Sequence, residues 1–184
     1  MSKAFVRQNA DGSFSLGNAA FELVVGLTAG GFPALRLLRL SQSEVDWASP
    51  AAPLGPELTI QGVQYSLSRG NLLFSRFQAD TELRLVYGLD QGLEVTQHFQ
   101  PSPDKAVWRS WLSLHNLSTV PIEGITRFDA ANLVFSAGES HRYRADFWSG
   151  LPERNYTGAE LMEKGYTCTL ENTRNADTMV LTKK

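Results

Sequence analysis

Cysteine is almost absent from this sequence: among its 184 residues, Cys168 is the single thiol. One cysteine excludes an intrachain disulfide and is typical of a protein kept in a reducing compartment. The longest apolar runs are far shorter than a membrane span, and Met1–Arg7 lacks the apolar core of a secretory signal. We therefore expect a cytoplasmic protein with no membrane partner.

An excess of one charge is also missing. Lys and Arg total 17, Asp and Glu total 19, and the formal net charge is -2. Such a balance argues against a nucleic-acid partner, which would favour a strongly basic surface. A hydrophobic content of 42% with 20% charged residues is that of an ordinary globular domain able to bury a core.

Catalytic and metal-binding signatures are equally scarce. The three histidines, His98, His115 and His141, are far apart and show no metal-ligand spacing, so we expect no metal and no cofactor. A structural role is favoured for each of them. No Gly-x-Ser-x-Gly nucleophile motif occurs, and Cys168 stands in an alternating, strand-like context that favours a buried thiol. The sequence therefore predicts no catalytic residue.

What the sequence does contain is a strong period of two. Apolar residues alternate through Phe21–Leu27, and again through Leu83–Leu89 and Leu93–Phe99. This alternation is typical of strands with one buried face. The last two runs are joined only by Asp90-Gln91-Gly92, a connection that predicts a hairpin with a positive φ angle at Gly92.

Further strands are expected along the rest of the chain. Ala106–His115 is apolar on both faces and should lie between two apolar layers. The one helix candidate is Ala159–Lys164, where Thr157 and Glu160 have the spacing of a capping box. The weaker strand candidates are Phe32–Leu40, Leu58–Ile60, Val63–Leu67, Leu72–Gln78, Ile122–Phe128 and Tyr143–Trp148. Many short strands between turns predict one all-β sandwich or barrel domain over residues 1–184, with at most one short helix.

Four residues are candidates for binding a sugar: Asp46, Trp47, Trp148 and Glu153. A tryptophan on a loop can stack on the apolar face of a sugar while a nearby carboxylate accepts hydrogen bonds from its hydroxyl groups. A core position is the more frequent fate of a tryptophan, and an ordinary surface position that of a carboxylate. Both interpretations stay open.

The middle of the chain resembles a known family. An ordered series of segments is similar to a part of the bacterial α-galactosidases of glycoside hydrolase family 36. The segments are Leu93–Phe99, Pro101–Lys105, Val107–Asn116 and Val120–Glu123. Two further parts of the sequence extend the resemblance over most of the chain. They are the opening, with Phe21–Leu27 and Gly30-Gly31, and the later Trp148-Ser149-Gly150 with Glu153-Arg154.

This resemblance implies a specific architecture and role. In that family the N-terminal domain is an antiparallel β-supersandwich, similar to galactose mutarotase, and it precedes a (β/α)₈ barrel that carries both catalytic aspartates. Residues 1–184 would then be the non-catalytic N-terminal domain, with the barrel downstream of Lys184. The resemblance further implies an α-galactoside as the parent enzyme's substrate, a homo-oligomer, and a loop at Asp46-Trp47 that reaches a neighbouring subunit's active site.

Two other functions remain as alternatives. A free-standing carbohydrate-binding β-sandwich would use Trp47 and Trp148 directly. A sugar mutarotase is less favoured. It needs a histidine that acts as a general acid and a glutamate that acts as a general base in one cleft, and no such motif surrounds the three histidines.

Overall fold

A computed structural model describes residues 3–48, 53–129, 143–148, 167–172 and 177–182. It divides into two compact units, Met1–Ala137 (unit 1) and Gly138–Lys184 (unit 2), which are described separately. Apart from one 3-10 turn, η1 (Leu67–Arg69), the described elements are strands: β1 (Phe5–Gln8), β2 (Phe14–Gly17), β3 (Phe21–Leu27), β4 (Pro33–Leu40), β5 (Glu57–Ile60), β6 (Val63–Tyr65), β7 (Leu73–Ala79), β8 (Leu83–Leu89), β9 (Leu93–Pro101), β10 (Trp108–Asn116), β11 (Ile125–Asp129), β12 (Tyr143–Trp148), β13 (Thr167–Asn172) and β14 (Asp177–Thr182).

The first sheet of unit 1 is the antiparallel meander β1-β2-β3-β4. Phe21, Leu23 and Val25 of β3 are buried, as the alternation in the sequence predicts, but Leu27 at the end of the strand is exposed. The strands β1 and β2 are four residues each, too short for their alternation to be recognised in the sequence.

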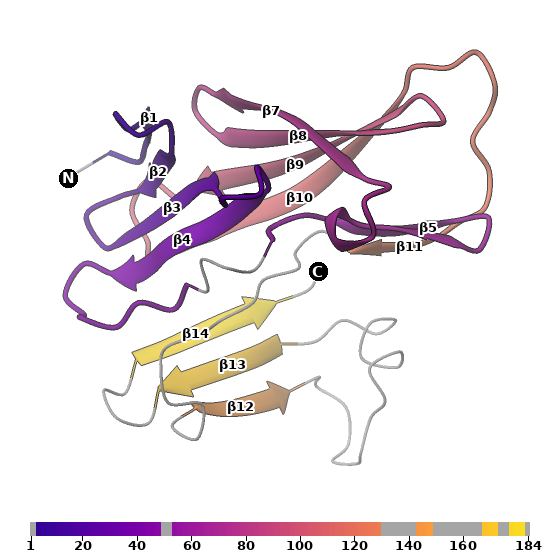
Figure 1. Ribbon diagram of the computed structural model, residues 1–184. Helices are drawn as coiled ribbons and strands as arrows, with labels where there is room; N and C mark the ends of the chain where they lie inside the picture. Colours follow the sequence, from indigo (N-terminus) through magenta and orange to yellow (C-terminus); the bar gives the residue numbers. More distant parts are fainter. Residues whose placement is uncertain (1–2, 49–52, 130–142, 149–166, 173–176, 183–184) are drawn as a thin grey trace. The chain divides into compact units, whose positions relative to one another are not determined.

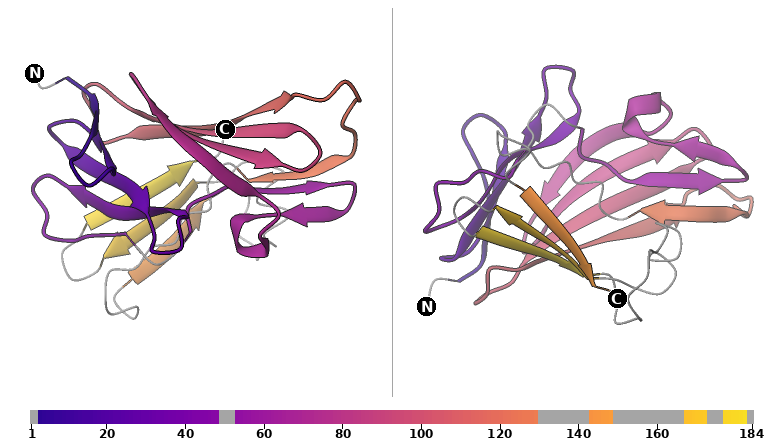
Figure 2. Two further views of the ribbon diagram at one scale, coloured as in Figure 1. Left: turned by 45° about the horizontal axis from the view of Figure 1, so that its top comes forward. Right: turned by 90° about the horizontal axis from the view of Figure 1, so that it is seen from below.

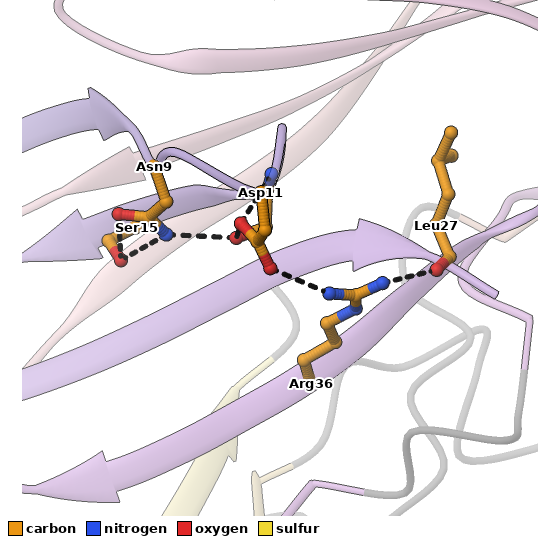
Figure 3. A network of polar contacts seen from close by, with 6 residues as sticks. Asn9, Asp11, Ser15, Leu27 and Arg36 are labelled. Carbon is orange, nitrogen blue, oxygen red and sulfur yellow. Dashed lines mark hydrogen bonds and ion pairs between the residues drawn. The ribbon is translucent and has the colours of Figure 1, made fainter.

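A hydrogen-bonded network holds the turn between β1 and β2 (Figure 3). The Asp11 carboxylate accepts from the backbone N–H and the hydroxyl group of Ser13, at 3.0 and 2.6 Å. Arg36 on β4 spans the sheet: one guanidinium nitrogen donates to Asp11 and the other to the carbonyl oxygen of Leu27. The two hydrogen bonds from Ser13, and after them the Coulombic attraction of Arg36, lower the pKa of Asp11.

The second sheet of unit 1 is the meander β7-β8-β9-β10, in which each strand again pairs with its neighbour in the chain. The hairpin of β8 and β9 has the register that its three-residue loop predicts: Leu89 lies opposite Leu93, and Gly92 has φ of 76°. Leu83, Leu85, Val95 and Phe99 are fully buried on one face of this sheet.

The two four-stranded sheets lie against each other (Figures 1 and 2). The rings of Phe14 and Phe77 meet across the interface with centroids 5.0 Å apart, and those of Phe21 and Trp108 are 6.0 Å apart. The amide nitrogen of Asn18 donates to two carbonyl oxygens of the loop between β9 and β10, each at 2.7 Å. The prediction of an all-β, antiparallel, sandwich-like fold is thus confirmed.

Two smaller sheets complete the described structure. In unit 1, β11 pairs with β5, which pairs with β6. The turn η1 that follows β6 is capped by the Ser66 hydroxyl group at its start and by Gly70, with φ of 72°, at its end. Unit 2 holds the sheet β12-β13-β14, in which Phe147 lies opposite Cys168.

Some expectations for unit 1 are wrong. The strand predicted at Val63–Leu67 ends at Tyr65, and the one predicted at Ile122–Phe128 begins at Ile125. The strand predicted at Ala106–His115 exists as β10, but its residues are half-exposed or exposed on both faces. The sequence explains the exposure of one face, because Arg109, Ser113 and His115 put charged and polar groups there beside Trp111. The helix candidate Ala159–Lys164 lies outside the described residues, and a single domain over residues 1–184 stays a prediction.

Candidate binding face on the β7–β10 sheet

Asp46 and Trp47, two of the predicted sugar-binding residues, lie after β4 in unit 1. The Asp46 carboxylate accepts hydrogen bonds from the backbone N–H groups of Leu38 and Ala48, at 3.0 and 2.9 Å. The Trp47 side chain is only 3% exposed. Asp46 therefore fixes this loop against β4, and the Trp47 ring packs in the core.

The other two predicted residues are far along the chain. Trp148 is the last residue of β12 in unit 2, opposite Thr167, and Glu153 lies outside the described residues. The structure thus places two of the four in unit 1 and one in unit 2. Sugar binding by these four residues stays a prediction.

The structure instead brings together five residues that the sequence did not connect. The alternation of β9 puts His98 on the face opposite its buried residues. Arg84 of β8 and Trp111 of β10 are the direct cross-strand partners of His98, so the three form one row across the sheet. Glu82 and Ser113 join them, and we call the set Glu82, Arg84, His98, Trp111 and Ser113 the His98 face.

Hydrogen bonds fix the imidazole of His98 at both nitrogens. Its Nδ1 lies 3.1 Å from Oε1 of Glu82, and its Nε2 lies 3.0 Å from Oγ of Ser113. The Trp111 ring stacks on the imidazole, with centroids 4.6 Å apart and planes inclined by only 7°. His98 therefore has little rotational freedom, and it supports the Trp111 ring from one side.

The charges of this face are largely compensated. Arg84 forms an ion pair with Glu82, whose side chain is 10% exposed, and His98 is 12% exposed. Burial alone raises the pKa of Glu82, but the hydrogen bonds from Arg84 and His98 outweigh this effect and hold that pKa below its ordinary value of 4.5. Glu82 is thus an ionised carboxylate at neutral pH.

The hydrogen-bonded chain of side chains Glu82–His98–Ser113 has the same residue types as the carboxylate, base and nucleophile of acyl-transfer enzymes. Such chemistry additionally needs hydrogen-bond donors that stabilise the developing oxyanion. The Arg84 guanidinium donates to Glu82 and is engaged in orienting the carboxylate. The arrangement can present a rigid aromatic ring and a hydroxyl group to a ligand.

Part of this face was accessible to sequence reasoning. The three-residue loop at Asp90-Gln91-Gly92 fixes the register of the hairpin, and that register places Arg84 opposite His98. Trp111 could not be placed in the same way, because the longer connection between β9 and β10 leaves their register open.

Within the described residues, no three side chains of the His, Cys, Asp or Glu type gather as a metal site, and no helix is long and apolar enough to cross a membrane. Comparisons of this chain with protein-family models, with curated proteins and with solved structures find no match.

Proposed function

We propose that this chain is the non-catalytic N-terminal domain of an α-galactosidase-like glycoside hydrolase. The observation that carries the proposal is the ordered resemblance of Leu93–Asn116, a segment that folds as the hairpin of β9 and β10. The all-β, sandwich-like fold is the class that the resemblance implies, which supports the proposal without identifying the family.

In this proposal the domain supports folding and homo-oligomer assembly of a cytoplasmic enzyme. The substrate of the parent enzyme is an α-galactoside, and the catalytic aspartates belong to a barrel that follows Lys184. The chain alone should then not hydrolyse an aryl α-galactoside.

Immunodepletion of source-cell extract tests this function. An antibody raised against the 184-residue chain is used to remove its antigen, and hydrolysis of 4-methylumbelliferyl α-galactoside is measured before and after. We expect an immunoblot band several-fold larger than this chain and a parallel loss of activity, with pre-immune serum as the control. A band of the size of 184 residues, or full activity after complete depletion, would contradict the proposal.

The second candidate function, a free-standing carbohydrate-binding sandwich, is favoured by one observation. Trp111 is half-buried on the outer face of the β7–β10 sheet and is backed by His98. A rigid aromatic ring on a sheet face, with polar groups beside it, is a common way to hold a ligand by its apolar side.

A further inference from the structure

We propose that the His98 face binds a neutral pyranoside, with the Trp111 ring as its stacking surface. The choice of a galactoside among neutral sugars rests on the proposed function. The binding surface itself is argued from the geometry of unit 1 and is separate from the catalytic pocket of any parent enzyme.

The first argument is the rigidity of Trp111. One side of its ring is covered by the imidazole of His98, which is held in turn by Glu82 and Ser113. A ring that is already fixed loses little conformational entropy when a ligand stacks on it. β10 is also the terminal strand of its sheet among the described strands, and Trp111 is partly exposed, so His98 does not cover the whole ring.

The second argument is the placement of polar groups along β10. Arg109 precedes Trp111 by two residues and Ser113 follows it by two, so all three belong to one face of the strand. Both flanking residues are exposed. Each lies roughly 7 Å from Trp111 along the strand, a spacing comparable with a pyranose and its hydroxyl groups. The guanidinium can donate hydrogen bonds to the sugar hydroxyls, and the serine oxygen, which is bonded to His98, can accept one.

The third argument is charge, which selects a neutral ligand. Arg84 is paired with Glu82, and Arg76 is paired with Glu94 on the same face of the sheet. An anionic ligand would have to compete with these two carboxylates for Arg76 and Arg84, which leaves the exposed Arg109 as the guanidinium beside Trp111. A neutral sugar needs no compensating charge and can use the hydrogen-bond donors that remain.

The fourth argument concerns the sugar's shape. In a galactoside, the axial hydroxyl group at C4 leaves the C–H groups at C3, C4 and C5 together on one face of the ring. That apolar face matches the flat surface of an indole ring, while the hydroxyl groups on the rim point toward polar neighbours.

The test is a titration of the full 184-residue chain, labelled with ¹⁵N, with methyl α-D-galactopyranoside. The four tryptophans give four indole N–H signals, and that of Trp111 is assigned with Trp111→Phe. We expect a saturable shift of the Trp111 signal and no shift of buried Trp47. Trp111→Ala should weaken binding about tenfold or more, and Trp111→Phe should weaken it less, because a smaller stacking ring remains.

The control is Trp108→Phe, which changes a ring on the opposite face of the same strand, where Trp108 packs near Phe21. It should bind with unchanged affinity, and circular dichroism checks that each variant is folded. If the Trp111 signal shows no saturable shift, or if folded Trp111→Ala binds with unchanged affinity, the His98 face is not the sugar-binding surface. Equal affinity for methyl α-D-glucopyranoside would overturn the galactoside assignment.

The outcomes separate this inference from the proposed function. Sugar binding through Trp111, with no α-galactosidase activity removed by immunodepletion, would retain the surface and reject the parent enzyme. Depletion of the activity without any response at Trp111 would support the parent enzyme and reject the binding surface.

Discussion

At the scale of single residues, the buried core of unit 1 contains two polar side chains that face each other. Tyr87 and Gln97 are both 0% exposed. The Tyr87 hydroxyl group donates to the carbonyl oxygen of Leu54 at 2.9 Å and lies 3.2 Å from Oε1 of Gln97. Because buried polar groups are costly when they lose a partner, this contact ties the loop that contains Leu54 to β8.

Replacing Tyr87 by phenylalanine should therefore destabilise the protein. We expect Tyr87→Phe to lower the free energy of unfolding by about 1–2 kcal/mol in urea titrations, because the Leu54 carbonyl group loses its donor inside the core. Tyr65→Phe is the matched control, since the Tyr65 hydroxyl group accepts one bond from the side chain of Gln91 at a part-buried position. An equal effect of both substitutions would contradict this explanation.

The burial of Tyr87 also predicts how the free energy of unfolding changes in alkaline solution. Burial raises its pKa well above the ordinary value of 10.0. The folded state thus disfavours the phenolate, and the contribution of Tyr87 is complete below pH 10.0 and is lost as the pH rises toward the folded pKa. The decline of unfolding free energy above that pH should be less steep in Tyr87→Phe than in the unaltered chain.

Glu82 has the opposite pH dependence. Its pKa is lowered in the folded protein, so its contribution to stability is present above its ordinary pKa of 4.5 and is lost as the pH falls through the folded value. We expect the unfolding free energy, measured between pH 6 and 2, to fall less in Glu82→Gln than in the unaltered chain. Glu44→Gln, which removes an exposed carboxylate, is the control for the loss of one negative charge.

At the scale of elements, the turn between β8 and β9 depends on one glycine. Gly92 has φ of 76°, a conformation that residues with a Cβ atom rarely adopt, and an added Cβ would approach Ser118 to 3.3 Å. Gly92→Ala should lower the free energy of unfolding by about 1–2 kcal/mol. Gly88→Ala, in β8 of the same hairpin and without a neighbour within 4 Å of the added Cβ, should be neutral or slightly stabilising. Denaturant titrations of both variants compare the two positions.

The same hairpin shows how far sequence reasoning reaches. The period of two and a three-residue loop were enough to predict β8, β9 and their register, because the positions facing the core and the turn both constrain the pairing. The strands β1 and β2 were not predicted, since four residues carry too little alternation. The exposure of β10 was predicted wrongly, because its apolar content was given more weight than the polar residues at alternate positions.

At the scale of the whole chain, the sequence predicted the class of fold but not its division into sheets. Alternating strands require two layers that cover each other's apolar faces, so the sandwich-like arrangement follows from the pattern. Which strands share a sheet depends on long-range contacts, such as that of Phe14 with Phe77. For the same reason, the alternation of β9 puts His98 on the face opposite its buried residues, but it does not bring Trp111 beside it.

The order of the strands has a consequence for the time course of folding. In the β1–β4 and β7–β10 meanders, every strand pairs with its neighbour in the chain, so only short loops must close and the entropic cost is small. β5 differs, because beyond its hairpin with β6 it pairs with β11, after the whole second meander has intervened. During synthesis, the first meander can thus form before β7 emerges from the ribosome, whereas the outer edge of β5 cannot pair with β11 until Ile125–Asp129 has also emerged.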